Sequence, residues 1–222
     1  VVELNGILYI SGFHELEGDS IERFNIAQSR WQSALNIPVT TTGILCLATD
    51  GTDLYVGTED AGTLQMSTNG TLIQSWDTSA GLSANEVIDI ELDVLTGQMI
   101  AIHPFSGMSV IDTNSTTINE TWTTNSGGLE TNQMNSLAVR GGIAYLGTNN
   151  RGVERIDIAN STRLTPWTST GLDDLESMPI AIDGDTLYLG LYGFGVIVYN
   201  VSSGEQIDVW QRTGGGPGGG GN

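Results

Sequence analysis

Two histidines are the first candidates for metal or acid–base chemistry in this 222-residue chain. His14 opens the string His-Glu-Leu-Glu-Gly, which begins like the helical zinc-protease motif but has Gly18 where the second histidine should stand. His103 lies in a separate repeat unit, and nothing in the sequence specifies a third ligand for the pair. We therefore predict no metal site, and we expect both histidines to be exposed loop residues.

Four carboxylates beside expected strands raise the alternative of glycoside hydrolysis, which needs two carboxyl groups flanking the scissile bond. Asp50 and Asp183 each precede a glycine, and turn formation explains an Asp-Gly pair. Asp89 and Glu91 occupy alternate positions of one strand-like segment, as residues on a polar face do. We predict no catalytic residue, and we keep a carbohydrate-active enzyme that uses Asp89 and Glu91 as the rival hypothesis.

Charge and composition exclude several other classes of function. The chain has 26 acidic side chains against seven basic ones, all arginine, and a formal net charge of −19. Such a surface does not suit nucleic acid, and a chain without lysine has neither a lysine-containing phosphate loop nor a Schiff-base site. No apolar run reaches the ~20 residues of a membrane helix, so we expect no membrane insertion. We expect the single cysteine, Cys46, to be a small buried residue of a strand.

Repeated residues with one period define the expected architecture. The tryptophans, 45, 46, 45 and 43 residues apart, are Trp31, Trp76, Trp122, Trp167 and Trp210. A second set, in steps of 46, 45, 45 and 43 residues, comprises Tyr9, Tyr55, Ile100, Tyr145 and Tyr188. We expect the tryptophans to be packing residues of the outer strands, because a repeated position indicates a structural role.

Each unit contains short segments of alternating polar and apolar residues, separated by turns rich in Gly, Asn and Asp. This is typical of four antiparallel strands. A four-stranded unit repeated every ~40–45 residues predicts an all-β β-propeller, either as a five-bladed ring or as part of a larger one. The expected blades are about 1–35, 36–79, 80–125, 126–169 and 170–212, and a Gly-rich tail or linker follows at 213–222.

Three strings resemble the repeats of two-component-regulator-type propellers, which are WD40- or YVTN-like. They are GLSANEVIDIELDVLTGQMIAI, LYVGTEDAGTLQMS and AYLGTNNRGVERID. The resemblance covers residues 1 to about 212 and departs in the first, third and fifth units, which lack the Gly-Thr pair. In such an architecture, the loops between second and third strands and the loops between blades form the usual binding face.

The loops that would form this face are acidic and carry several aromatic side chains. That composition suits a cationic group, the face of a sugar or a bound Ca²⁺, and Ca²⁺ is the only cofactor that we consider. The predicted ligand-binding residues are Glu15, Glu59, Asp60, His103, Phe105, Asn149, Arg151, Tyr192 and Phe194.

An acidic chain without lysine is typical of proteins exported into saline settings, where salt screens the repulsion between acidic side chains. We therefore expect an extracellular, cell-surface or periplasmic location. The expected function is non-enzymatic binding of a protein, a glycan or a small ligand, by a monomeric domain of a longer surface or sensor protein. A purely structural scaffold is a further alternative.

Five Asn-x-Ser/Thr triplets could carry glycans in an archaeal or eukaryotic secreted protein, but would have no role in a bacterial one. The triplets begin at Asn69, Asn114, Asn119, Asn160 and Asn200. All except Asn119 fall near expected turns between third and fourth strands, where asparagine is common in any case.

Overall fold

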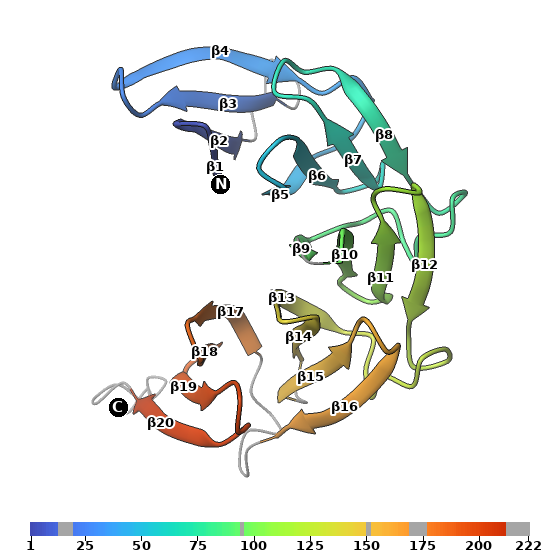
Figure 1. The fold of residues 1–222 in the computed structure, drawn as a ribbon, viewed down its shortest axis with the longest axis vertical. Coiled ribbons are helices and arrows are strands. Elements are labelled where there is room, and N and C mark those ends of the chain that lie inside the picture. The colour runs from blue at the N-terminus through green and yellow to red at the C-terminus, as the bar shows by residue number, and fades with distance from the viewer. Residues whose placement is uncertain (13–19, 94–95, 150–151, 169–176, 212–222) are drawn as a thin grey trace, which may run out of the picture. The chain divides into compact units, whose positions relative to one another are not determined.

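The computed structural model describes residues 1–12, 20–93, 96–149, 152–168 and 177–211. Within these ranges the chain forms strands and turns and no helix, and therefore no helix that could cross a membrane. Twenty strands form five separate four-stranded antiparallel sheets, each built from four consecutive strands in chain order (Figure 1). The prediction of an all-β fold with five four-stranded units is confirmed.

The sheets follow one another along the chain. The first comprises β1 (Val2–Leu4), β2 (Ile7–Gly12), β3 (Ser20–Asn25) and β4 (Arg30–Asn36). The second comprises β5 (Ile44–Thr49), β6 (Leu54–Thr58), β7 (Thr63–Met66) and β8 (Leu72–Trp76). The third comprises β9 (Asp89–Asp93), β10 (Gln98–His103), β11 (Gly107–Asp112) and β12 (Thr117–Trp122). The fourth comprises β13 (Met134–Arg140), β14 (Ile143–Thr148), β15 (Gly152–Asp157) and β16 (Thr162–Trp167). The fifth comprises β17 (Ser177–Asp183), β18 (Thr186–Leu191), β19 (Gly195–Asn200) and β20 (Gln206–Gln211).

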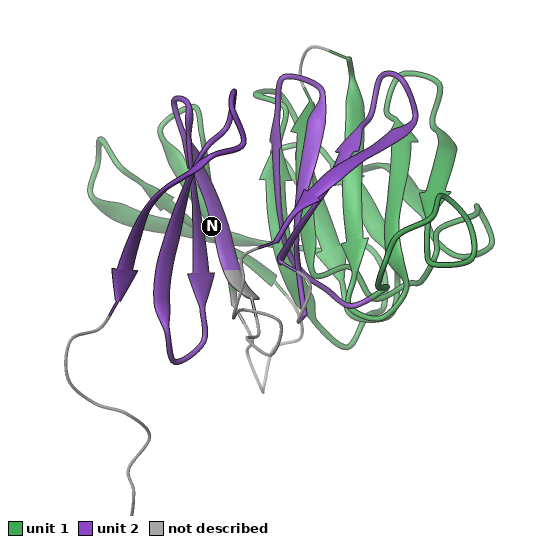
Figure 2. Ribbon diagram, turned by 90° about the horizontal axis from the view of Figure 1, so that it is seen from below, with its two compact units in different colours: residues 1–132 green, residues 133–222 purple. Residues whose placement is uncertain are grey.

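The sheets are divided between two compact units, residues 1–132 and 133–222, which Figure 2 shows in different colours. In the first unit, β5 contacts β1 and β2, and β9 contacts β5 and β6. In the second unit, β17 contacts β13 and β14. Within each unit, consecutive sheets therefore pack against each other near their first strands.

Apolar clusters fill the spaces between these neighbouring sheets. In the first unit, Tyr9 and Ile21 of the first sheet share a cluster with Val56 of the second. In the second unit, Trp167 of the fourth sheet stacks on Tyr199 of the fifth, with ring centroids 5.1 Å apart. Each fully buried side chain of this kind contributes about 1.5–3 kcal/mol, so the sheets are held together mainly by these clusters.

The second repeated set occupies one register position, as its spacing predicts. Its members lie in the second strand of each sheet, each paired with the corresponding residue of the third strand. The predicted packing role holds for Trp76, Trp122 and Trp167, which are 1%, 5% and 7% exposed.

Trp31 does not occupy the position of the later tryptophans, although its spacing from Trp76 fits the period. Trp76 ends β8 opposite Thr63, whereas the corresponding pair in the first sheet is Leu35 with Ile21. Leu35 is 5% exposed and Trp31 is 60% exposed. The prediction of a packing role is wrong for Trp31, because Leu35 fills that position in the first sheet. It is also wrong for Trp210, which occupies that position in the fifth sheet, opposite Val196, but is 51% exposed.

Candidate functional site

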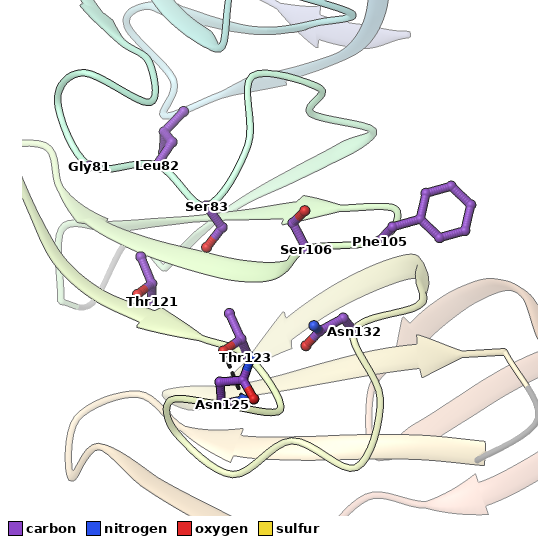
Figure 3. Close-up of a pocket in the computed structure, with 9 residues that line it drawn as sticks. All are labelled: Gly81, Leu82, Ser83, Phe105, Ser106, Thr121, Thr123, Asn125 and Asn132. Atoms are coloured by element: carbon purple, nitrogen blue, oxygen red, sulfur yellow. Dashed lines mark hydrogen bonds between the residues drawn. The ribbon is translucent and has the colours of Figure 1, made fainter.

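An open cavity of about 320 Å³ lies at one end of the third sheet, within the first unit (Figure 3). Three segments line it: the linker residues 81–83, the β10–β11 turn residues Phe105 and Ser106, and Thr121, Thr123, Asn125 and Asn132 from the end of β12 and the linker that follows. These are turns between second and third strands and linkers between sheets. The cavity therefore lies among the loops that the sequence assigned to the binding face, and Phe105 is a predicted site residue.

The cavity is polar but uncharged. None of its nine described lining residues carries a charge, and most of their side chains end in a hydroxyl or an amide group. Phe105 is 72% exposed and stands at the rim, with its ring extending away from the polar side chains (Figure 3). A ligand there meets hydrogen-bonding groups beside an accessible aromatic surface.

Hydrogen bonds within the linkers hold the polar wall in place. Asn132 Oδ1 accepts a 2.7 Å hydrogen bond from the backbone N–H of Thr124, which leaves its Nδ2 as the donor for a ligand. In the preceding linker, Asn85 Oδ1 accepts a 2.8 Å hydrogen bond from Thr78 in the same way. Because both linkers are fixed by an asparagine, the cavity is largely formed before any ligand arrives.

The linker 77–82 is also fixed by Asp77. Its Oδ1 accepts hydrogen bonds from the hydroxyl and backbone N–H of Ser79 and from the N–H of Ala80. These bonds, with that from the Ser79 hydroxyl the largest, lower the pKa of the Asp77 carboxyl. Asp77 therefore acts as a turn-forming carboxylate rather than as a free ligand-binding group.

A buried polar network joins the cavity wall to His103. The imidazole Nδ1 lies 2.9 Å from the carbonyl oxygen of Glu86, and Nε2 lies 3.0 Å from Ser109 Oγ. Because a carbonyl oxygen only accepts, Nδ1 carries the proton and Nε2 accepts from the Ser109 hydroxyl. Ser109 Oγ in turn accepts a 3.2 Å hydrogen bond from the backbone N–H of Ser83, which lines the cavity.

The expectation of an exposed His103 is therefore wrong. His103 ends β10, and its side chain is 0% exposed. Burial is the main cause that lowers its pKa to about 4, so the imidazole is neutral at physiological pH. His103 supports the cavity through Ser109 instead of contacting a ligand directly. The sequence feature that could have indicated a buried His103 is the apolar run before it, because His103 follows Met99-Ile100-Ala101-Ile102 at the end of a buried strand.

The predicted acidic residues of the second sheet lie in the β6–β7 turn and do not line the cavity. Asp60 Oδ1 accepts a 2.6 Å hydrogen bond from the Thr41 hydroxyl and a 3.0 Å bond from the N–H of Thr42. The Thr41 bond is the main cause that lowers the pKa of the Asp60 carboxyl. Asp60 therefore ties the linker before β5 to this turn, while the side chain of Glu59 is exposed.

Three of the predicted site residues that the structure describes belong to the second unit. Tyr192, in the β18–β19 turn, is 68% exposed and accessible. Phe194 is half-buried and packs against the apolar cluster of this unit. Asn149 donates a 3.1 Å backbone hydrogen bond to the carbonyl of Gln133. The predicted residues Glu15 and Arg151, together with His14 and the tail 213–222, lie outside the described residues.

The carboxylates considered for glycoside hydrolysis include one that forms a turn and one that is half-buried on a strand. Asp50 forms a turn, because its Oδ1 accepts 2.8 Å hydrogen bonds from the N–H groups of Thr52 and Asp53. Glu91 lies on β9 and is half-buried, and its burial, with the charge of Asp89 second, raises its pKa to about 7. Across the described parts of the chain, no group of three or more His, Cys, Asp or Glu side chains could hold a metal ion.

Comparison with known proteins identifies the fold. No protein-family model matches the sequence, and no curated protein is similar to it. The structure is similar to the computationally designed Ika8 protein, with a TM-score of 0.72 and 14% identity over 95% of this chain and 61% of Ika8. It is also similar to the extracellular domain of the hybrid two-component system BT3049 from B. thetaiotaomicron, with a TM-score of 0.70 and 14% identity over 90% of this chain and 28% of that one.

The designed Ika4 protein matches with a TM-score of 0.61 and 16% identity, over 77% of this chain and 98% of Ika4. The fold is that of a β-propeller. The chain spans 61% of the length of Ika8 and 28% of the BT3049 domain. At these identities the similarities show the fold alone.

Proposed function

We propose that this propeller is a non-enzymatic recognition domain of an extracytoplasmic protein and that it binds a neutral glycan in the cavity of the third sheet. The observation that carries the proposal is the combination of uncharged hydroxyl and amide side chains with the exposed ring of Phe105 around one opening of about 320 Å³. Sugars present hydroxyl groups as donors and acceptors, and the lining offers both.

Charge favours a neutral ligand over a charged one. Among the described residues, no charged side chain lines the cavity to pair with a cation, and a net charge of −19 repels anions over the whole surface. A neutral glycan therefore fits this cavity better than a cationic ligand or a strongly acidic one.

The extracytoplasmic location has two lines of support. One structural neighbour is an extracellular domain of a hybrid two-component system. The sequence has no lysine and many acidic side chains, which suits an exported protein in a saline setting. Together with the resemblance to two-component-regulator-type repeats, these features favour a module of a larger surface or sensor protein.

A glycan-binding screen with the labelled full chain tests the proposal, using Phe105→Ala and Asn132→Ala as the cavity variants. Tyr192→Ala is the matched control, because Tyr192 is a comparably exposed aromatic residue of the second unit. We expect binding of a neutral oligosaccharide that both cavity variants lose and the control keeps. Binding that only the Tyr192 variant loses would place the site in the second unit and overturn the proposal.

Glycan cleavage is the second candidate, and the raised pKa of Glu91 favours it. A carboxyl group with a pKa of about 7 beside Asp89 is protonated often enough to act as a general acid. This candidate requires hydrolysis of an oligosaccharide that Glu91→Gln abolishes while the far-UV spectrum stays unchanged. Turnover that survives this substitution removes Glu91 from any catalytic role.

A further inference from the structure

An alanine, a tyrosine and a tryptophan occupy the same register positions in three of the sheets, and we call each set a triad. The alanine of the first strand pairs with the tyrosine of the second. The tryptophan of the fourth strand pairs with one of the first two residues of the third. The triads are Ala48, Tyr55 and Trp76 in the second sheet, Ala138, Tyr145 and Trp167 in the fourth, and Ala181, Tyr188 and Trp210 in the fifth.

In the second and fourth sheets, the next sheet along the chain covers the triad. Each of these six residues is at most 8% exposed. The second-sheet triad shares an apolar cluster with Met99 of the third sheet, and the fourth-sheet triad shares one with Leu187 of the fifth. Two separate examples in this chain therefore show that a triad is a surface on which another sheet packs.

The fifth-sheet triad has the same geometry but is accessible. Its two rings have centroids 5.6 Å apart and planes at 42°, against 5.4 Å and 44° in the fourth-sheet triad. Trp210 is 51% exposed, and Ala181 is exposed as well. The tail at 213–222 has no apolar side chain except that of Pro217, so its composition does not supply a cover. The triad is therefore arranged for packing before any partner arrives.

The first sheet presents the surface that a triad contacts. In the second unit, Trp167 stacks on Tyr199 of the fifth sheet, with ring centroids 5.1 Å apart. The register counterpart of Tyr199 in the first sheet is Phe24, because each pairs with the residue just before the second-strand tyrosine. Phe24 is half-buried, as are its neighbours Leu8 and Ile10, whereas their three counterparts in the fifth sheet are at most 3% exposed.

We infer that the protein associates head to tail with a second copy of itself, the fifth-sheet triad of one copy packing on Leu8, Ile10 and Phe24 of the other. Trp210 then stacks on Phe24, as Trp167 stacks on Tyr199 within the chain. One chain carries both halves of a contact of a kind that it already forms internally, which favours a second copy over an unrelated protein.

Such a contact joins two different surfaces. Each bound copy therefore keeps one free surface, and association continues beyond a dimer unless a ring of copies closes. The inference goes beyond glycan binding, because neither surface includes the cavity of the third sheet. It also departs from the sequence-based expectation of a monomeric domain.

Sedimentation velocity of the full chain, over a concentration series at about 0.1 M and about 1 M NaCl, tests the association. Each copy carries a net charge of −19, so repulsion opposes contact at low salt, and salt screens this repulsion without weakening an apolar contact. We expect concentration-dependent oligomers that are more abundant at the higher salt. A monomer under all conditions would overturn the inference. Oligomers that dissociate at the higher salt would also overturn it, because ion pairs would then hold them.

One variant on each surface tests the head-to-tail geometry. Trp210→Glu disrupts the fifth-sheet triad, and Phe24→Glu disrupts the surface of the first sheet. We expect each variant alone to be monomeric and an equimolar mixture to form a dimer, because the mixture holds one intact surface of each kind. Tyr192→Ala is the control, since it removes an exposed aromatic side chain outside both surfaces and should associate like the parent protein.

The mixture also controls for folding, because a dimer forms only if both variants are folded. Ile10→Glu replaces Phe24→Glu if the far-UV spectrum of the latter shows a loss of strands. A folded first-sheet variant that still self-associates would show that the first sheet is not the partner surface. That result would overturn the inference, as would two folded variants that do not dimerise when mixed.

Discussion

The backbone N–H of Ser83 donates a 3.2 Å hydrogen bond to the Oγ of Ser109, which joins the wall of the cavity to a buried histidine. Ser109 is 0% exposed and cannot reach a ligand itself. Its hydroxyl donates to His103 and accepts from Ser83, so one side chain satisfies polar groups on two elements. The position of Ser83 in the cavity therefore depends on residues that no ligand contacts.

Removal of this link should weaken binding without removing any contact group. Ser109→Ala leaves the Ser83 N–H and His103 Nε2 without their partner, and a lost buried hydrogen bond costs about 1–3 kcal/mol of stability. We expect at least a several-fold loss of affinity for any oligosaccharide found in the screen, together with a lower urea midpoint. Ser115→Ala is the control, because Ser115 is an exposed serine of the β11–β12 turn of the same sheet and does not line the cavity. Equal affinities of Ser109→Ala and the parent protein would show that the network does not position the wall.

Acid should destabilise the first unit through His103. The folded-state pKa of about 4 lies below the ordinary value of 6.5, so the unfolded chain binds a proton first as the pH falls. Stability is therefore lost as the pH decreases from about 6.5 towards 4, by up to about 3 kcal/mol for this group. Urea unfolding at pH 7 and pH 4 measures the loss. The His103→Gln variant should be less stable at pH 7. Its free energy of unfolding should differ less between pH 7 and pH 4 than that of the parent protein, by about this amount. An unchanged difference would show that His103 does not titrate with a lowered pKa.

Glu91 should make the protein less stable at higher pH, whereas His103 makes it less stable in acid. Its folded-state pKa of about 7 lies above the ordinary 4.5, so the folded protein holds a proton that the unfolded chain has lost between these values. Ionisation of Glu91 therefore reduces stability as the pH rises through 7. We expect Glu91→Gln to stabilise the protein by about 1–2 kcal/mol at pH 8 and to have little effect at pH 4.5. An equal change in stability at both pH values would show that Glu91→Gln acts through packing and not through charge.

Gly107 should tolerate no side chain. Its φ is 77°, and a Cβ there would overlap the carbonyl oxygen of Trp122 on the neighbouring strand. Gly107→Ala should cost about 2–4 kcal/mol, because the backbone must shift in addition to the strain of a left-handed alanine. Gly141 is the matched control: its φ is 59°, and nothing lies within 4 Å of the corresponding Cβ. Gly141→Ala should cost only about 1 kcal/mol. Similar urea midpoints for the two variants would contradict the overlap.

The repeat made the fold predictable from the sequence, because each repeat forms the same four-stranded sheet. Tyr9, Tyr55 and their counterparts lie in the second strand of every sheet, and each pairs with the corresponding position of the third strand, so their spacing matches the register of the sheets. Trp31 shows the limit of spacing. Leu35 satisfies the packing position of the first sheet, and Trp31 lies on the surface 45 residues before Trp76.

The candidate site was only partly predictable. Phe105 was predicted from its position in the β10–β11 turn, and it lines the cavity. Glu59 and Asp60 were predicted because they are charged, and they lie outside the cavity. The cavity wall consists of neutral linker residues whose positions depend on hydrogen bonds along the linker. The recurrence of Asn85 and Asn132, each of which holds its own linker, is the sequence signal that could have indicated an ordered wall.

Residue-level mapping of a bound oligosaccharide shows directly whether the cavity of the third sheet is the binding site. The ¹⁵N-labelled full chain is titrated with the neutral oligosaccharide that binds best in the screen, and backbone amide shifts are followed by NMR. We expect saturable changes at residues 81–83, at Phe105 and Ser106, and around Asn132, with residues 133–211 unaffected apart from the first positions after Asn132. Shifts centred on Tyr192, or no saturable shift with any neutral oligosaccharide, would contradict recognition at this cavity.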